Sequence, residues 1–295
     1  MLKVGFIGLG IMGKPMSKNL IKAGYKLIVC DLNQSAVDDL VSNGAEKALT
    51  PKEVAEQCEF IITMLPDSPQ VKEVVLGING LMEGLKTGTV FIDMSSISPI
   101  VSRELSRELE KKGVDMLDAP VSGGEPKATD GTLSVMVGGK EYVFEKSYPI
   151  LKAMAASVVH TGSIGAGNVT KLANQIIVAL NIAAMSEALV LATKAGVEPE
   201  LVYKAIRGGL AGSKVLDAKV PLVMDRNFNP GFRINLHIKD LSNALETSHE
   251  LGVPLPLTSA VMEIMQALKV DGLGDKDHGS LIQYYEKLAK IEVRR

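Results

Sequence analysis

The chain is poor in aromatic residues and in cysteine, and neither sign of charge is concentrated in one region. Only 4% of its 295 residues are aromatic, and the two cysteines, Cys30 and Cys58, fall in or beside predicted strands. This usage argues against a disulfide framework and predicts a reduced, cytoplasmic protein. The net charge is −2, with no basic block and no acidic tail, which argues against a nucleic-acid partner.

Motifs for metal binding and for covalent catalysis are also missing. The four histidines share no metal-ligand spacing, no cysteine joins them, and no Gly-x-Ser-x-Gly or Cys/His nucleophile arrangement occurs. We therefore expect a reaction without a metal, in which an organic cofactor supplies the reactive group. One of the four, His249, is expected to be a solvated helix residue.

One long apolar stretch is present. Between residues 167 and 194 there is no proline and no internal glycine, so we expect a single helix over 167–195, of about seven to eight turns. Apolar side chains lie on most of its sides, which predicts burial on nearly all sides. Lys171, Asn174 and Glu187 interrupt this surface, which favours the core helix of a soluble protein and argues against a membrane span.

Two different patterns of hydrophobic residues occur along the chain. In residues 1–163, short β-branched runs alternate with amphipathic helices, which predicts a parallel sheet with helices on both faces. In residues 164–295, helical periodicity continues almost without a strand signal. We therefore predict an α/β fold in which an N-terminal domain, 1–163, precedes an all-helical domain, 164–295. The expected strands are 3–7, 27–31, 60–65, 90–94 and 114–118, with 133–137 and 158–160 closing the sheet.

A glycine-rich turn follows the first strand and opens a helix. Gly8, Gly10 and Gly13 have the spacing of a dinucleotide-binding turn, and Asp31 at the end of the second strand can bond both ribose hydroxyls. The helix N-terminus offers N–H groups to the phosphates. The alternative is a tight turn without a ligand. Because the charge of Asp31 repels a 2′-phosphate and no arginine follows it, NAD(H) is favoured over NADP(H).

Further cofactor contacts are expected at the same edge of the sheet, where parallel strands end. They are the intervening turn residues Leu9, Ile11 and Met12, together with Leu65, Pro66 and Ser96 after two later strands. For Ser96 a simple helix-capping role is the alternative.

The predicted substrate end has an anion cradle and an acid. Ser122, Gly123 and Gly124 follow another strand, and two glycines in a concave turn present backbone N–H groups that suit a carboxylate, although an ordinary loop is the alternative. Lys171 is the best candidate for the acid that hydride transfer needs, since a largely desolvated lysine passes protons near neutral pH. Asn174, one turn on, can orient the substrate; a lysine that snorkels to solvent is the alternative.

These motifs, in this order, resemble the β-hydroxyacid dehydrogenase family over essentially the whole chain. The resemblance implies a Rossmann-type cofactor domain, a helical domain organised on the long helix, and homo-oligomers built through the helical domains. It implies a catalytic role for Lys171, substrate binding by Ser122, Gly123, Gly124 and Asn174, and cofactor contacts by Ser96 and Lys239. A surface ion pair with Asp240 is the alternative for Lys239. Many relatives have a second asparagine where this chain has Gln175, which leaves that amide's role open.

Particular stretches, among them 62–66, 123–128, 207–213 and 231–239, are most similar to the branch of the family that reduces tartronate semialdehyde. The implied reaction is NAD(P)H-dependent reduction of this small anion to D-glycerate. Two alternatives within the family are oxidation of 3-hydroxyisobutyrate and reduction of succinic semialdehyde. A catalytically silent nucleotide-binding or scaffold protein is the alternative of another class, against which the presence of Lys171 and Asn174 argues.

Overall fold

The computed structural model describes residues 2–295, and the chain divides into two compact units, one ending at Lys171 and the other spanning Leu172–Arg295. The division falls within the long helix α9 (Ala166–Lys194), which was expected over 167–195. The sequence had placed the domain boundary just before this helix begins.

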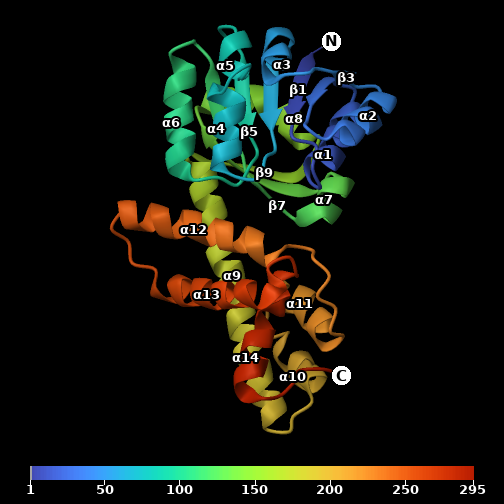
Figure 1. Cartoon of the computed structure of the whole chain (residues 1–295), viewed down its shortest axis with the longest axis vertical. Helices are drawn as coiled ribbons and strands as arrows, with labels where there is room; N and C mark the ends of the chain where they lie inside the picture. The colour runs from blue at the N-terminus through green and yellow to red at the C-terminus, as the bar shows by residue number, and fades with distance from the viewer. Residues whose placement is uncertain (1) are drawn as a thin grey trace. The chain divides into compact units, whose positions relative to one another are not determined.

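The first unit is the predicted Rossmann-type domain, with helices on both faces of one sheet (Figure 1). In order across the sheet, the strands are β3 (Glu46–Lys47), β2 (Lys26–Cys30), β1 (Lys3–Ile7), β4 (Phe60–Thr63), β5 (Val90–Asp93), β6 (Asp115–Asp118), β8 (Leu133–Gly139) and β7 (Val121–Ser122), with β9 (Ala155–Gly162) pairing β8. The helices are α1 (Gly13–Lys22), α2 (Gln34–Ser42), α3 (Pro51–Gln57), α4 (Ser68–Leu76), α5 (Leu81–Gly84), α6 (Pro99–Glu110), α7 (Gly124–Asp130) and α8 (Glu141–Lys152).

The alternation of side chains along the central strands explains why helices cover both faces of the sheet. Phe6 of β1 belongs to a core cluster with residues of α1, α2, α7 and α8, whereas its neighbour Ile7 packs in a second cluster with residues of α3 to α6. Successive side chains of a strand point to opposite faces, so a run of apolar residues fills both cores. Local sequence sets the start of α3, where Thr50 Oγ1 accepts from the N–H of Glu53 at 3.2 Å and Pro51 is the first helical residue.

The sheet is parallel from β3 to β6 and again between β8 and β9, so the expectation of a parallel sheet fails only where β8 meets β6 and β7. β8 runs antiparallel to β6 and β7, with Asp118 opposite Gly138. Only residues 123–132, most of them in α7, separate β7 from β8. A parallel crossover needs about a dozen residues or more, so this short connection returns the chain antiparallel to β7.

The second unit is helical, as predicted. After α9 come α10 (Pro199–Ile206), α11 (Lys214–Met224), α12 (Ile234–Glu250), α13 (Pro256–Leu268) and α14 (Ile282–Ala289), with single turns at Lys269–Leu273 and His278–Leu281. Their apolar faces meet in one core, to which α9 contributes Ile182, Met185 and Leu189.

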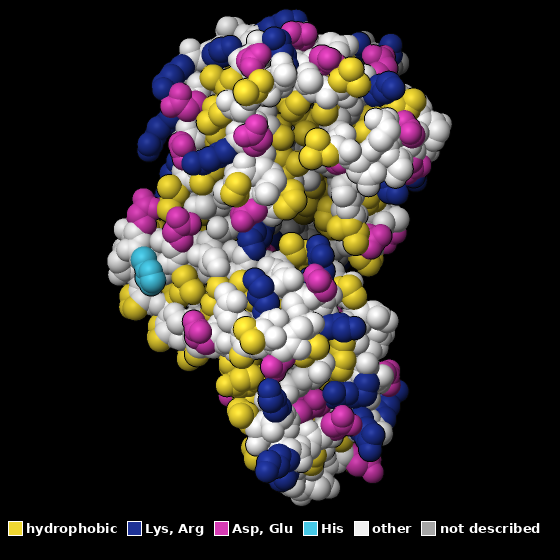
Figure 2. Space-filling model, in the orientation of Figure 1, with side chains coloured by type: hydrophobic (Ala, Val, Ile, Leu, Met, Phe, Trp, Pro, Cys, Tyr) yellow, Lys and Arg dark blue, Asp and Glu magenta, His cyan; other side chains and the backbone are white. Residues whose placement is uncertain are grey.

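The composition of α9 predicted burial on nearly all sides, and this prediction was wrong. Ile177 and Leu191 are 61% and 73% exposed, and Ala173, Ala184 and Ala188 are exposed as well. At 100° per residue these five positions fall within about 60° of one another, which makes one continuous apolar stripe, the α9 stripe. Apolar side chains also reach the surface of the helical unit in Figure 2. An all-apolar composition cannot distinguish a core face from a face left for another partner.

Within residues 2–295, α9 is the one helix whose length and composition match those of a membrane span. The core helix of a soluble protein meets the same criterion, and 39% of its most apolar window is buried. The polar side chains of Lys171 and Gln175 are among the buried ones.

Candidate active site

The glycine-rich turn joins β1 to α1 and has a backbone that side chains would block. Gly8 has a φ of +96°, and its N–H donates to the carbonyl of Cys30 at 3.1 Å. A Cβ on Gly13 would lie 1.9 Å from the Gly8 carbonyl oxygen, whereas a Cβ on Gly10 would meet nothing within 4 Å. Gly13 therefore permits close packing of turn and helix, and Gly10 leaves open space at the start of α1. That open space fits the pyrophosphate of a dinucleotide.

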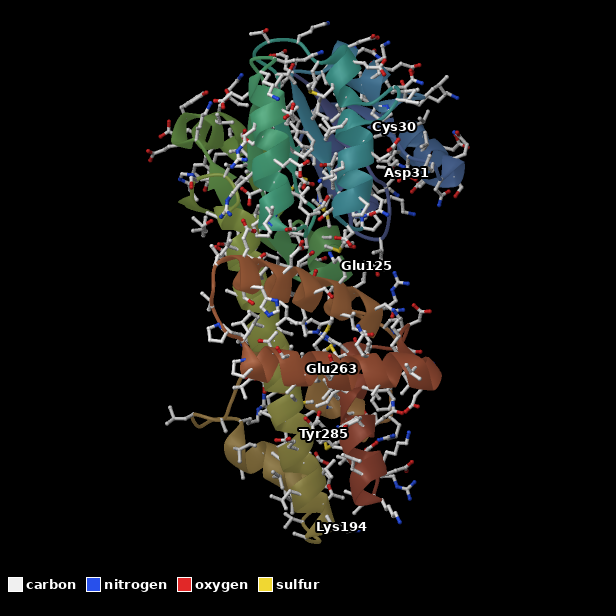
Figure 3. The ribbon with its side chains drawn as sticks, turned by 60° about the vertical axis from the view of Figure 1, so that its left-hand side comes forward. Cys30, Asp31, Glu125, Lys194, Glu263 and Tyr285 are labelled. Atoms are coloured by element: carbon white, nitrogen blue, oxygen red, sulfur yellow. The ribbon has the colours of Figure 1, made fainter. Side chains whose placement is uncertain are left out.

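Asp31 follows Cys30 at the end of β2 (Figure 3) and ties two loops together. One carboxylate oxygen accepts from the N–H of Leu9 at 2.5 Å, and the other accepts from the N–H of Asn33 at 2.7 Å. Each oxygen can accept a second hydrogen bond, so both remain able to bind a ribose hydroxyl. The turn and its acid are thus held together by the chain itself.

The ends of β4 and β5 are joined by polar side chains that the sequence analysis did not single out. The N–H of Leu65 donates to Ser95 Oγ at 2.9 Å, and the N–H of Ser95 donates to the buried Asp93 carboxylate at 3.1 Å. Thr63 donates to the same Asp93 oxygen at 2.8 Å. Leu65 and Pro66 are thereby held beside the loop that carries Ser96, which is half-buried.

The predicted anion cradle lies where β7 ends and α7 begins. Ser122 is the last residue of β7, and Gly123 and Gly124 follow with φ values of 137° and 67°. Gly124 is the first residue of α7, so these N–H groups belong to the end of a helix at which backbone donors have no partner within the helix. An anion near them gains from the helix dipole as well.

Lys171 lies in the second turn of α9, and the first turn is anchored by a carboxylate from the sheet. Asp118, the last residue of β6, accepts from the N–H of Gly165 and from the N–H of Asn168, both at 2.7 Å. Burial raises the pKa of the Asp118 carboxyl to about 7, and the two N–H bonds oppose that rise. Asp118 therefore fixes the start of the helix that carries Lys171, which is itself only 7% exposed.

The side chain of Asn168 fixes the same turn from a second direction. Its Oδ1 accepts from the N–H of Ile97 at 3.1 Å, and its Nδ2 donates to Ser102 Oγ at 3.1 Å. Asn168 is completely buried, so these bonds satisfy a side chain that would otherwise be costly. The loop after β5, which carries Ser96, and the start of α9 are in this way one hydrogen-bonded unit. Sequence reasoning missed this residue because nothing local marks an asparagine whose partners lie 66 and 71 residues away.

Asn174 and Lys239 both belong to the second unit, where a chain of polar contacts connects them. Asn174 Nδ2 donates to Gln175 Oε1 at 2.9 Å, and Gln175 Nε2 donates to Asp240 Oδ2 at 2.5 Å. Lys239 Nζ lies 2.9 Å from the other oxygen of Asp240, which is 2% exposed. The Lys239–Asp240 pair is thus a largely buried ion pair inside α12, and the alternative of a surface ion pair was wrong. Gln175, whose role the sequence left open, connects the two predicted site residues.

Two buried histidines in the second unit, His237 and His278, are joined by hydrogen bonds. His237 Nε2 donates to the Gln175 carbonyl at 3.1 Å, so its Nδ1 accepts from His278 Nδ1 at 3.0 Å. The predicted solvated residue, His249, is exposed. Within residues 2–295, no three His, Cys, Asp or Glu side chains gather as a metal site would require.

The first unit thus gathers the glycine-rich turn, Asp31, Leu65, Pro66 and the loop with Ser96 at the edge where parallel strands end, and Lys171 on a helix anchored at that edge. The second unit carries Asn174 and Lys239.

Two families of known proteins match successive parts of the chain. Residues 3–162 match the NAD-binding domain family of 6-phosphogluconate dehydrogenase. Residues 165–285 match a family described as NAD-binding of NADP-dependent 3-hydroxyisobutyrate dehydrogenase.

Individual relatives match over nearly their full length. The chain is 46% identical over 292 residues to 2-hydroxy-3-oxopropionate reductase of Escherichia coli (strain K12), covering 99% of this chain and 100% of that protein. It is 39% identical over 293 residues to 2-(hydroxymethyl)glutarate dehydrogenase of Eubacterium barkeri, covering 99% and 97%. A solved structure of 3-hydroxyisobutyrate dehydrogenase from Mycobacterium tuberculosis matches with a TM-score of 0.91 at 32% identity, covering 97% and 99%.

The fold, its dinucleotide-binding turn and these relatives define an NAD(P)-dependent oxidoreductase that acts on the CH–OH group of hydroxy acids. The chain belongs to the 3-hydroxyisobutyrate dehydrogenase-like β-hydroxyacid dehydrogenase family.

Proposed function

We propose that this protein reduces tartronate semialdehyde (2-hydroxy-3-oxopropanoate) to D-glycerate, with NADH as the preferred reductant. The observation that carries the proposal is the 46% identity, over the whole length of both chains, to a 2-hydroxy-3-oxopropionate reductase. The buried Lys171 beside an anchored helix start supports it, because the reaction needs a held proton donor.

The residues have distinct roles in this proposal. When bound, the reduced nicotinamide supplies a hydride to the aldehyde carbon. Lys171 donates a proton from its ammonium group to the aldehyde oxygen as that oxygen becomes a hydroxyl. Ser122 and the N–H groups of Gly123 and Gly124 bind the carboxylate, and Asn174 holds the substrate in register with Lys171.

Replacement of Lys171 by alanine tests the proton donor. We expect kcat with tartronate semialdehyde to fall by ~10²-fold or more while NADH still binds, because a positioned general acid contributes about this much. Lys194→Ala is the matched control, since Lys194 ends the same helix on the exposed side (Figure 3). Full activity in Lys171→Ala would remove Lys171 from the mechanism.

A substrate panel distinguishes the proposal from its alternatives within and outside the family. We expect the highest kcat/KM with tartronate semialdehyde, compared with methylmalonate semialdehyde and succinic semialdehyde. A preference of about tenfold for methylmalonate semialdehyde, equivalent to ~1.4 kcal/mol, would assign the protein to 3-hydroxyisobutyrate instead. NADH binding without turnover of any aldehyde acid would favour a scaffold role.

The preference for NADH is proposed from Asp31. Its charge would repel a 2′-phosphate, and the following side chains, Leu32 and Asn33, carry no positive charge to receive one. Asp31→Asn removes the charge at constant size. We expect the ratio of kcat/KM for NADH to that for NADPH to fall by about tenfold or more, because the repulsion between the Asp31 carboxylate and the 2′-phosphate of NADPH is lost. An unchanged ratio would show that Asp31 does not set the preference.

The α9 stripe leads us to propose a homo-oligomer formed through the helical unit. Exposed apolar positions spaced three, four and seven residues apart along one helix are what a second copy of that helix would cover. Ile177→Glu should shift the protein toward monomers in sedimentation velocity. Ile78→Glu is the matched control, because Ile78 is 89% exposed in the first unit. A monomeric wild-type protein would refute the proposal.

A further inference from the structure

A cavity of about 390 Å³ lies in the first unit beside α6, at the amino end of β6. The predicted cofactor residues follow the carboxyl ends of the parallel strands, so they lie at the other end of β6. None of the residues assigned to cofactor or substrate lines this cavity.

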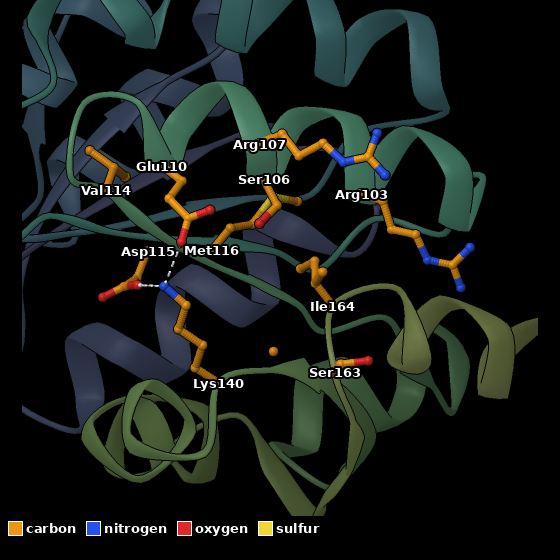
Figure 4. Close-up of a pocket in the computed structure, with 11 residues that line it drawn as sticks. Arg103, Ser106, Arg107, Glu110, Val114, Asp115, Met116, Lys140, Ser163 and Ile164 are labelled. Carbon is orange, nitrogen blue, oxygen red and sulfur yellow. Dashed lines mark hydrogen bonds and ion pairs between the residues drawn. The ribbon is translucent and has the colours of Figure 1, made fainter.

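One face of α6 forms a wall of the cavity. Arg103, Ser106, Arg107 and Glu110 are spaced three, four and seven residues from the first, so they share one side of the helix. Figure 4 shows these side chains along the helix, with Glu110 near Lys140 and the two guanidinium groups toward the other end.

The charged side chains at one end of this cavity form ion pairs, and those at the other end do not. Lys140 Nζ lies 3.0 Å from a carboxylate oxygen of Glu110 and 3.0 Å from one of Asp115. Within residues 2–295, the neighbouring carboxylates Glu104 and Glu108 pair with Lys72 and Lys111. Neither Arg103 nor Arg107 has a carboxylate within 4.0 Å, the limit for an ion pair, in this part of the chain. Two positive charges one helical turn apart thus form no ion pair with the described part of the chain.

The remaining lining suits a small organic anion. Ser106 and Ser163 add hydroxyl groups, and Met116 and Ile164 add an apolar surface. The chain also leaves room for the Arg103 side chain, since a Cβ on Gly165 would lie 2.9 Å from Arg103 Nε.

We propose that this cavity binds a small phosphate monoester, with the phosphoryl group held between Arg103 and Arg107. Guanidinium groups present planar pairs of N–H donors that match phosphoryl oxygens, and two of them suit a dianion. The hydroxyl groups of Ser106 and Ser163 supply further donors, and the apolar surface accepts the carbon skeleton. The paired carboxylates of Glu110 and Asp115 disfavour a second anionic group at the far end of the ligand. The site is independent of the proposed reaction.

Calorimetric titration of the full chain with glycerol 3-phosphate tests the proposal. Saturating NADH is present throughout, so that the phosphate-binding turn after β1 is occupied and does not compete for the probe. We expect a dissociation constant on the order of 1 mM. Arg103→Gln/Arg107→Gln should weaken binding by about tenfold or more, because the charge-assisted bonds are lost. The matched control is Lys22→Gln/Lys26→Gln, which removes the same charge from exposed positions elsewhere in the first unit.

Retained NADH binding by each variant shows that it is folded. Equal affinity for glycerol 3-phosphate in the arginine variant and the wild type would overturn the site, as would equal losses in the arginine and lysine variants. Malonate, a dicarboxylate of similar size, is titrated in parallel. If malonate binds as tightly as the phosphate monoester, the assignment of the ligand class is wrong.

Discussion

Each unit of the molecule has a buried aspartate that accepts from two or more backbone N–H groups, and these two aspartates differ in their surroundings. Asp118 in the first unit accepts from two N–H groups, those of Gly165 and Asn168. Asp277 in the second unit accepts from three, those of Gly231, Phe232 and Gly279, and also pairs with Lys219 at 2.8 Å.

Because of this difference, the pKa values of the two carboxyl groups shift in opposite directions. Burial raises the pKa of Asp118 to about 7, and the nearby charge of Asp93 adds to the rise. Burial also raises the pKa of Asp277, but His278 and Lys219 beside it, together with its hydrogen bonds, more than offset this and hold the pKa below its ordinary value. A cation within contact distance therefore decides whether a buried carboxyl with several N–H donors is easily ionised.

The largest effect is expected where the charge is paired. Asp277→Ala should cost about 3–5 kcal/mol of unfolding free energy in the second unit, because it leaves the largely buried Lys219 ammonium and the N–H groups unpaired. Hydrogen exchange followed by mass spectrometry locates the loss. We expect faster exchange in α11 and α12 and an unchanged sheet in the first unit.

Asp277→Asn separates charge from shape in the same experiment. It keeps one acceptor oxygen at nearly constant volume and loses the charge that faces Lys219. An effect as small as that of an exposed substitution, below about 0.5 kcal/mol, would mean that Asp277 does not organise this unit.

The two units were also unequally predictable from the sequence. In the first, strand positions follow from β-branched runs, and β1 was placed at its observed bounds, Lys3–Ile7. The turn and Asp31 follow from local spacing along the chain. The roles of Asp118 and Asn168 could not be predicted in this way. Their hydrogen bonds, which hold the start of α9, join residues that lie 47 to 71 positions apart in the sequence.

In the second unit, helix positions were predictable but polar contacts were not. The helical character of residues 164–295 was predicted because helical periodicity is local, and the observed helices, such as α11 (Lys214–Met224), follow it. The contacts of Gln175 with Asp240 and of His237 with His278 depend on how helices pack, and no spacing in the sequence encodes them. The assignment of catalytic and binding roles to individual residues remains a prediction.

Opposite pH dependence of the two units is the next expected effect. The folded state binds the Asp118 proton more tightly than the unfolded chain, whose carboxyl has a pKa near 3.8, so stability is lost as the pH rises from there through about 7. Asp118→Asn removes this contribution. Urea unfolding should show that the free energy of unfolding falls more between pH 5 and pH 7.5 in the wild type than in the variant. The difference should be on the order of 1 kcal/mol for each pH unit between 5 and the folded-state pKa. Parallel changes in both proteins would contradict it.

His278 gives the second unit the reverse sign. Burial, followed by the neighbouring His237 and Lys219, lowers the pKa of His278 well below 6.5. The unfolded chain then binds the proton more tightly, so stability is lost as the pH falls below 6.5. Hydrogen exchange corrected for its intrinsic pH dependence should therefore show the helical unit loosening on acidification, and His278→Gln should reduce that response. A response as large in His278→Gln as in the wild type would assign it to other groups.

The smallest effects are expected in the glycine-rich turn between β1 and α1. We expect Gly13 to be needed for backbone packing and Gly10 to be needed for open space. Gly13→Ala places a Cβ 1.9 Å from the Gly8 carbonyl oxygen, so the turn must shift, at a cost of about 1–3 kcal/mol in unfolding free energy. Gly10→Ala meets nothing within 4 Å, so the fold should keep its stability while NADH binding weakens, because the methyl group occupies the space left for the pyrophosphate. Urea unfolding and NADH titration of both variants separate the two effects. Unchanged NADH affinity in Gly10→Ala would mean that the cofactor does not approach the backbone there, and equal stability losses in both variants would mean that Gly13 has no special packing role.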